Sequence, residues 1–293
     1  IGFEVPARGK ALRCLMLELE RIHSHLLWLG IAGHILGFDT VLMQSWRVRE
    51  PVMWLTEMIS GSRKTYGMNL VGGVRRDISR ESAAKILEVV ATVGREVEEI
   101  YRAIAGDSTL HARTRGVGPL SAEKARDFCV VGPPARASGL PIDARLDHPY
   151  AAYDVFPPKL CTHPDGDTWS RVLVRLDETL DSVRLVHDIV ANLPEGPAMA
   201  EVGEIPEGRI GVSAVEAPRG EAIHFVETGG ENRPYRWRVR APTFPNLQAV
   251  PTMVSGQTIA DVPITIGSLD PCFSCTERME VVDLSDGRRK IYR

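Results

Sequence analysis

The sequence predicts a mainly α-helical protein with a small antiparallel β-sheet, an α+β fold. Apolar residues recur every three or four positions in four long stretches, which is typical of amphipathic helices. Of the 20 prolines, only Pro6, Pro51 and Pro119 precede residue 130, so the first part of the chain can hold long helices. Residues 208–241 change to an alternating apolar pattern, which predicts the sheet.

The first two predicted helices lie within the first 60 residues. Residues 10–36 carry leucine or isoleucine at positions 12, 15, 19, 22, 26 and 29, the spacing of one buried helix face. A turn near Asp39 separates this helix from a second one at residues 47–60. The longest apolar run, residues 26–38, is shorter than the roughly 20 residues that a membrane span needs. It therefore predicts a buried helix, and His34 within it predicts a hydrogen-bonded core histidine.

Two further helices are predicted later in the chain. Residues 81–105 place isoleucine and valine on one face, with a cap near Ser79 and a stop at Gly106. Residues 169–193 show the same periodicity and end before Pro194.

The alternating segment predicts three short strands. They lie at residues 210–215, 222–226 and 235–239. The Pro-Arg-Gly sequence at residues 218–220 supplies the turn between the first two strands.

These elements divide the chain into consecutive parts of one composite domain. They are a helical core at residues 1–130, an irregular proline-rich connection at 131–167, a long core helix at 168–194, a small β region with a metal-binding motif at 195–278, and a candidate cleavable C-terminal extension at 279–293. The long connection is expected to pack between the helices and the last third of the chain. The first residue is Ile1, so we expect a piece of a longer protein.

Composition and charge narrow the function classes. The 293 residues are 44% hydrophobic and 25% charged, which excludes a disordered tail, a collagen-like rod and a small disulfide scaffold. The formal net charge of -3 argues against nucleic acid as a partner. Only two of the five cysteines are close in sequence. This pattern indicates a reducing compartment and one metal or redox motif rather than a disulfide framework.

Cys272 and Cys275 form the most specific local motif, in the sequence Asp-Pro-Cys-Phe-Ser-Cys. Two thiols at this spacing on a turn can bind one soft metal ion, and the acidic neighbour can order the surroundings. A redox dithiol is expected near a βαβ unit, and a zinc ribbon needs two more close ligands. The sequence shows neither context, and two incidental loop cysteines are the remaining alternative.

Two other polar features have a structural and a functional interpretation. Arg219 sits in a turn that is either a polar hairpin tip or a donor of five N–H groups to a charged cofactor. His23 and His25 point about 200° apart on a helix, so they cannot share a metal ion. We expect His25 to face the core; proton relay through His23, His25 or His34 is the functional alternative.

Four segments carry a pattern that is shared with a known family. They are Leu-Glu-Leu-Glu-Arg-Ile-His-Ser-His-Leu-Leu-Trp-Leu-Gly at 17–30, Gly-Gly-Val-Arg-Arg-Asp at 72–77, Glu-Ala-Pro-Arg-Gly-Glu at 216–221 and Asp-Pro-Cys-Phe-Ser-Cys-Thr-Glu-Arg at 270–278. Together they resemble the large subunit of nickel–iron (NiFe) hydrogenases, in the membrane-bound, energy-converting branch that includes the formate hydrogenlyase type. The quinone-side catalytic subunit of respiratory complex I is homologous but has lost the metal-binding cysteines.

The resemblance implies a role for five residues. Cys272 would be a terminal nickel ligand, and Cys275 would bridge nickel to an iron that carries CO and cyanide. Arg219 would lie above the open metal position, Asp270 would orient it, and Pro218 would line the diatomic ligands of the iron. Because the pKa of arginine exceeds 12, the Cys272 thiolate is an equal candidate for the first proton acceptor.

The resemblance also implies an activity and partners. The reaction would be reversible H2 oxidation, with electrons passed to iron–sulfur clusters in a small partner subunit, because this chain has too few cysteines for a cluster. The complex would be held by membrane-anchored subunits on the inner, cytoplasmic face of the cell membrane. A maturation protease would cut between Arg278 and Met279 after nickel insertion.

One departure from the family pattern opens an alternative. The first CxxC pair of the family lies N-terminal to the region that matches this chain, so the chain alone is expected to be inactive. Cys14, Cys129 and Cys161 do not form a replacement pair. The alternative is a complex I-like, metal-free scaffold on the quinone side that docks iron–sulfur and membrane subunits.

Overall fold

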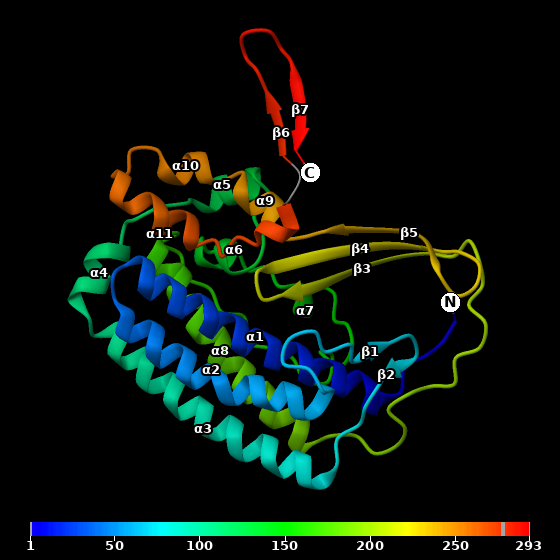
Figure 1. Cartoon of the computed structure of the whole chain (residues 1–293). Helices are drawn as coiled ribbons and strands as arrows, with labels where there is room; N and C mark the ends of the chain where they lie inside the picture. Colours follow the sequence, from blue (N-terminus) through cyan, green and yellow to red (C-terminus); the bar gives the residue numbers. More distant parts are fainter. Residues whose placement is uncertain (1, 277–278, 293) are drawn as a thin grey trace.

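Four long helices lie side by side in the computed structural model, which describes residues 2–276 and 279–292 (Figure 1). They are α1 (Ala7–Ile35), α2 (Asp39–Ser60), α3 (Arg80–Ala105) and α8 (Thr168–Ala191). α1 packs against α2 and α8, and α3 packs against α2 and α8. The main hydrophobic core therefore lies between these helices.

The predicted positions of three helices are confirmed to within a few residues. α1 starts directly after Pro6, whose fixed φ of -58° precedes the first turn. The Ser79 hydroxyl caps α3 by accepting the backbone N–H of Ser82 at 3.1 Å, and Gly106 follows the last turn. α8 ends at Ala191 rather than 193.

The predicted start of the second helix was wrong. α2 begins at Asp39, eight residues before the expected position 47, and it contains Pro51. Its buried face starts with Val41, Ser45 and Val48. The buried serine interrupts the apolar periodicity, so the first two turns carry too weak a pattern for recognition.

Short helices, which were not predicted, connect the long ones. They are α4 (Ser108–Thr114), α5 (Ala122–Asp127), α6 (Pro133–Ala137), α7 (Ala144–Asp147), α9 (Thr243–Leu247), α10 (Val250–Val254), α11 (Val262–Gly267) and the 3-10 turns η1 (Ile259–Asp261) and η2 (Phe273–Thr276). Elements of three to seven residues are too short to show helical periodicity. α6 packs on α8 and α7 packs on β3, so the connecting segment does lie between the helices and the sheet.

The three predicted strands form one antiparallel sheet in the order β3 (Ile210–Ala217), β4 (Gly220–Thr228) and β5 (Pro234–Arg240). Ala217 pairs with Gly220, which places residues 218 and 219 at the tip of the hairpin. The predicted α+β class is thus confirmed.

Two smaller hairpins complete the described chain. β1 (Asn69–Leu70) pairs with β2 (Gly73–Val74). β6 (Met279–Val282) pairs with β7 (Arg289–Tyr292), and this C-terminal hairpin projects from the body of the molecule (Figure 1). Arg278, on one side of the predicted cleavage point, lies outside the described residues.

The end of α1 differs from the prediction of a fully buried apolar run. Leu26 and Leu29 are buried, but Ile31 and Ile35 are exposed at the last turns. His34 is also exposed, so the predicted core histidine was wrong; its Nδ1 lies 2.7 Å from a carboxylate oxygen of Asp39. Among the helices that the structure describes, none combines the length and hydropathy that membrane crossing requires.

Candidate metal centre

The tip of the β3–β4 hairpin holds Arg219 against Asp270. The Arg219 Nε–H donates to the backbone carbonyl of Asp270 at 2.9 Å, and Nη2 lies 3.1 Å from Oδ1 of the same residue. Two contacts from one planar guanidinium fix its orientation more tightly than one contact would. About 29% of the Arg219 side chain is exposed, so the group is reachable from solvent.

Backbone geometry on both sides of this pair is unusual. Asp270 has a φ of 55°, in the left-handed region that non-glycine residues seldom adopt. Gly220 has a φ of 126°, and its Cα approaches Gly132 so closely that a Cβ on Gly220 would lie 2.9 Å from the Gly132 Cα. Pro218 is buried beside the turn. The hairpin tip is therefore held by backbone packing as well as by the ion pair.

Two sulfur atoms meet next to this pair. Sγ of Cys272 and Sγ of Cys275 are 3.0 Å apart on the η2 turn. The turn is closed by the Cys275 N–H, which donates to the Cys272 carbonyl at 3.0 Å. It is attached to α9 through the Cys272 N–H, which donates to Thr243 Oγ1 at 3.2 Å. The predicted CxxC turn thus presents both thiols to the same point.

The surroundings shift the pKa values of the two thiols in opposite directions. Partial burial opposes ionisation of Cys272, but hydrogen bonds from Cys275 and Ser274 and the nearby Arg219 charge lower its pKa below the usual value. Burial and the neighbouring Cys272 raise the pKa of Cys275 to about 11. Cys272 is the thiol that ionises first, as a soft metal ligand must.

The described residues include two convergent thiols, which fit part of the ligand set of a soft metal ion. Cys272 and Cys275 supply two convergent soft donors. Cys14 is buried on α1 and accepts the Ala152 N–H at 3.2 Å, and Cys129 and Cys161 lie on other segments as free thiols. Within residues 2–276 and 279–292, no three or more His, Cys, Asp and Glu side chains are arranged to hold a metal ion.

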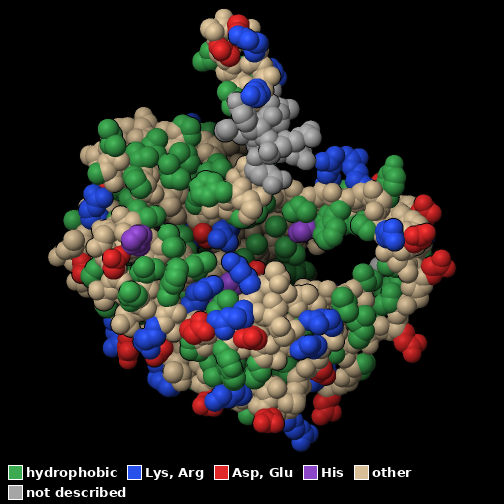
Figure 2. Space-filling model, viewed as in Figure 1, with side chains coloured by type: hydrophobic (Ala, Val, Ile, Leu, Met, Phe, Trp, Pro, Cys, Tyr) green, Lys and Arg blue, Asp and Glu red, His purple; other side chains and the backbone are tan. Residues whose placement is uncertain are grey.

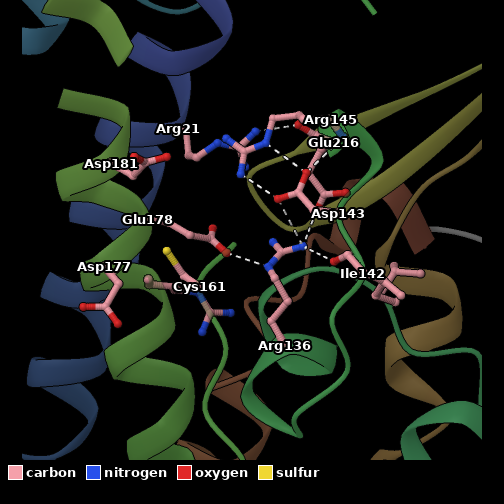
Figure 3. Close-up of polar contacts among 12 residues, drawn as sticks. Arg21, Arg136, Ile142, Asp143, Arg145, Cys161, Asp177, Glu178, Asp181 and Glu216 are labelled. Carbon is pink, nitrogen blue, oxygen red and sulfur yellow. Dashed lines mark hydrogen bonds and ion pairs between the residues drawn. The ribbon is translucent and has the colours of Figure 1, made fainter. Parts of the chain in front are cut away.

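A buried network of charges, which the sequence analysis missed, supports the hairpin from below (Figure 3). Arg136 donates from Nε to Glu178 at 2.7 Å and from Nη1 to Glu216 at 2.8 Å. Arg21 donates from Nη2 to the Glu216 carbonyl at 2.7 Å. Because Glu216 lies in β3 two residues before Pro218, the network joins α1, α6 and α8 to the strand that leads into the turn of Arg219.

The electrostatics of this network keep its central carboxylate ionised. Burial alone would raise the pKa of Glu178, but the Arg136 charge and the His25 hydrogen bond hold it well below its usual range. A second group links Arg145 to Asp143 at 2.7 Å and to Glu18 at 3.1 Å. One signal was present in the sequence: Glu18, Arg21 and His25 lie on a helix face that is otherwise apolar.

His23 and His25 of α1 have different partners, as their spacing predicted. His25 faces the core as expected, and its Nε2 lies 2.9 Å from Glu178. His23 Nε2 lies 2.7 Å from the Tyr66 hydroxyl. Burial lowers the pKa of each imidazole to about 4.

Sequence comparison identifies a matching family and related proteins. The family described as "Respiratory-chain NADH dehydrogenase, 49 Kd subunit" matches residues 36–209 and 201–278. Formate hydrogenlyase subunit 5 of Escherichia coli (strain K12) is 42% identical over 291 residues, which are 99% of this chain and 51% of that protein. The chain therefore spans about half the length of this relative. The membrane-bound hydrogenase subunit alpha of Pyrococcus furiosus is 38% identical over 96% of this chain and 70% of its own length.

Structure comparison agrees with the sequence. A chain in the structure of the membrane-bound sulfane sulfur reductase, an archaeal respiratory membrane complex, superimposes with a TM-score of 0.87. The alignment covers 93% of this chain and 76% of the other at 28% sequence identity. The arrangement of helices and sheet is therefore shared with a subunit of that complex.

Proposed function

The chain belongs to the family of the 49 kDa subunit of the respiratory-chain NADH dehydrogenase, and from this premise we propose that it serves in the large, catalytic subunit of a NiFe hydrogenase. The proposed reaction is reversible H2 oxidation and proton reduction. One observation carries the proposal: two cysteine sulfurs converge at 3.0 Å beside the Arg219–Asp270 pair.

Cys272 and Cys275 would hold the nickel–iron group, and Arg219 would face it. When bound, the group supplies the redox chemistry of hydrogen. The guanidinium of Arg219 would contribute a fixed positive charge and N–H donors at the place where H2 or its products lie. Asp270 orients this guanidinium through its carbonyl and its carboxylate, and Pro218 would line the iron side. Cys272 would accept a proton through its thiolate.

Partner subunits follow from the same proposal. The chain has five cysteines, all of them free thiols, so the electron path continues in iron–sulfur clusters of a small partner subunit. The Pyrococcus relative is named as membrane-bound. We therefore place this subunit on membrane-anchored partners, at the inner face of the cell membrane.

Nickel content and hydrogen evolution test the proposal together. The complex is purified from nickel-replete source cells with native sequence, with Cys272→Ser, with Cys275→Ser and with Cys129→Ser. Cys129 is an exposed free thiol outside the site and serves as the control. Both site variants should lose nickel and hydrogen evolution, and the control should keep both. Native complex without nickel would contradict the proposal.

A quinone-side scaffold is the second candidate function. It is favoured by the family match, because the matching family is described by the 49 kDa subunit of the respiratory-chain NADH dehydrogenase. Under this alternative the purified complex contains no nickel, and Cys272→Ser leaves its quinone reductase activity unchanged. The same purification therefore distinguishes the two functions.

A further inference from the structure

Strand β5 is an uncovered edge of the main sheet. In the order β3-β4-β5 it pairs with β4 on one side only, and no other described strand pairs with it. The opposite edge strand β3 is covered only at its C-terminal end, where α7 packs on it and Glu216 is buried, whereas Ile210 and Val212 at its start are exposed. Unpaired backbone groups on an edge strand are a template for a further strand.

The side chains of β5 are exposed on both faces of the sheet. Tyr235, Trp237 and Val239 lie on one face, with exposed fractions of 77%, 59% and 53%. Beneath them is a groove of about 440 Å³ lined by Trp237, Val71, Ile205 and Val226. Large apolar side chains are seldom gathered on a free surface, and such a patch marks an interaction site.

The other face of β5 carries only positive charge. Arg236, Arg238 and Arg240 alternate along the strand, and residues 234–240 contain no acidic residue. Arg240 pairs with Glu221. Arg236 lies opposite Glu227 of β4 in the strand register, but neither Arg236 nor Arg238 has an ion-pair partner within 4 Å among the residues that the structure describes. Figure 2 shows Lys and Arg side chains gathered above this strand.

We propose that β5 binds an extended, acidic segment of a partner subunit, which adds to the sheet as a fourth strand. Backbone hydrogen bonds along the edge would provide the affinity for the added strand. Contacts with alternate side chains of β5 would provide the selectivity. Opposite charges directly across a strand pair are stabilising, so the segment should place Asp or Glu opposite Arg236 and Arg238. Its other face should cover Trp237.

Charged residues on an edge strand can have another function, which is to prevent unwanted pairing with a strand of another molecule. That function needs no aromatic residues, and it does not explain the apolar groove beneath Trp237. An acidic strand is the occupant that fits all three observations: the bare edge, the arginines without ion-pair partners on one face, and the apolar opposite face.

Photo-crosslinking in the intact complex tests the proposal. Benzoylphenylalanine replaces Tyr235 in one sample, and Ile259, which is 90% exposed in the 3-10 turn η1, in the control sample. The Tyr235 probe should crosslink to a segment of another subunit that carries Asp or Glu at alternate positions. A crosslink to another part of the same subunit, to a second copy or to a helix, or no crosslink, would overturn the proposal.

A charge reversal provides the second arm. Arg236→Glu with Arg238→Glu should lower the crosslink yield at least tenfold and speed hydrogen exchange of the residue 236–240 amides. Arg95→Glu with Arg102→Glu makes the same charge change on exposed positions of α3 and should alter neither quantity. Unchanged yield in the β5 variant would refute the role of the arginines. Neither arm requires nickel, so the outcome is independent of the hydrogenase proposal.

Discussion

Arg136 and Glu178 form an ion pair with 2.7 Å between Nε and Oε1, and both side chains are at most 1% exposed. The pair joins α6 to α8. Through its Nη1, Arg136 also contacts Glu216 in β3. One guanidinium thus connects the helical core to β3, the strand that leads into the turn of Arg219.

Removal of Arg136 should be strongly destabilising. Arg136→Met leaves the carboxylates of Glu178 and Glu216 buried without their main partner, which is expected to lower the free energy of unfolding by about 3–5 kcal/mol. Arg47→Met is the matched control, because Arg47 lies 2.8 Å from Glu96 in an exposed pair and should cost less than about 1 kcal/mol. Urea unfolding measures both, and equal losses would show that the buried network adds no stability.

Acid should destabilise the fold through the α1 histidines. The pKa of His25 and of His23 is lowered to about 4 by burial, whereas an unfolded histidine has a pKa near 6.5. Between these values the unfolded chain binds protons that the native chain does not. The free energy of unfolding therefore keeps its full value above about pH 6.5. It falls as the pH decreases toward 4, by up to about 1.4 kcal/mol per pH unit for each histidine.

His25→Gln tests this pH dependence. The variant removes one titrating group, so its unfolding free energy should change less steeply with pH between 4.5 and 6.5 than that of the native protein. His34→Gln removes an exposed imidazole and serves as the control, with the native slope expected. An identical slope in all three proteins would contradict the assignment.

The sequence predicted the local parts of the site and missed its support. The hairpin tip at Arg219 and the turn at Cys272 and Cys275 arise from neighbouring residues, so turn chemistry and spacing were sufficient. The buried charge network does not arise from neighbouring residues, because Arg136 is 42 positions from Glu178 and 80 from Glu216 in the sequence. Only tertiary packing brings such residues together. The early start of α2 was missed for a local reason, since its buried face includes Ser45.

Gly220→Ala should displace the hairpin tip. Both the positive φ and the 2.9 Å approach to Gly132 oppose a Cβ at this position. Gly256 also has a positive φ, of 76°, but a Cβ added there would have no atom within 4 Å. Gly256→Ala therefore measures the backbone strain without a steric clash. The Gly256 variant should lose about 1 kcal/mol of stability, and the Gly220 variant clearly more, together with hydrogen evolution. Thermal unfolding and activity assays measure both variants. Equal losses in the Gly220 and Gly256 variants would show that the close approach to Gly132 is unimportant.

Arg219→Lys separates metal binding from turnover. Lysine keeps the charge but cannot reproduce the two contacts of the planar guanidinium with Asp270. We expect native nickel content and at least a tenfold loss of hydrogen evolution in the intact complex. Arg240→Lys, which alters the half-buried pair with Glu221 on the same sheet, should retain activity. Full turnover in the Arg219 variant would remove this residue from the mechanism.

The C-terminal hairpin is expected to be removed during maturation by cleavage between Arg278 and Met279. β6 begins at Met279, so this cut would release the paired strands β6 and β7 as one unit. While the hairpin is attached, the Cys272–Cys275 turn can stay open for metal loading, and its release lets the turn close, because metal binding and folding are coupled. Mass spectrometry of nickel-replete native complex should find a chain that ends at Arg278. The Cys275→Ser variant, which cannot load nickel, should retain residues 279–293. Fully active native complex that retains those residues would show that the hairpin is not a maturation peptide.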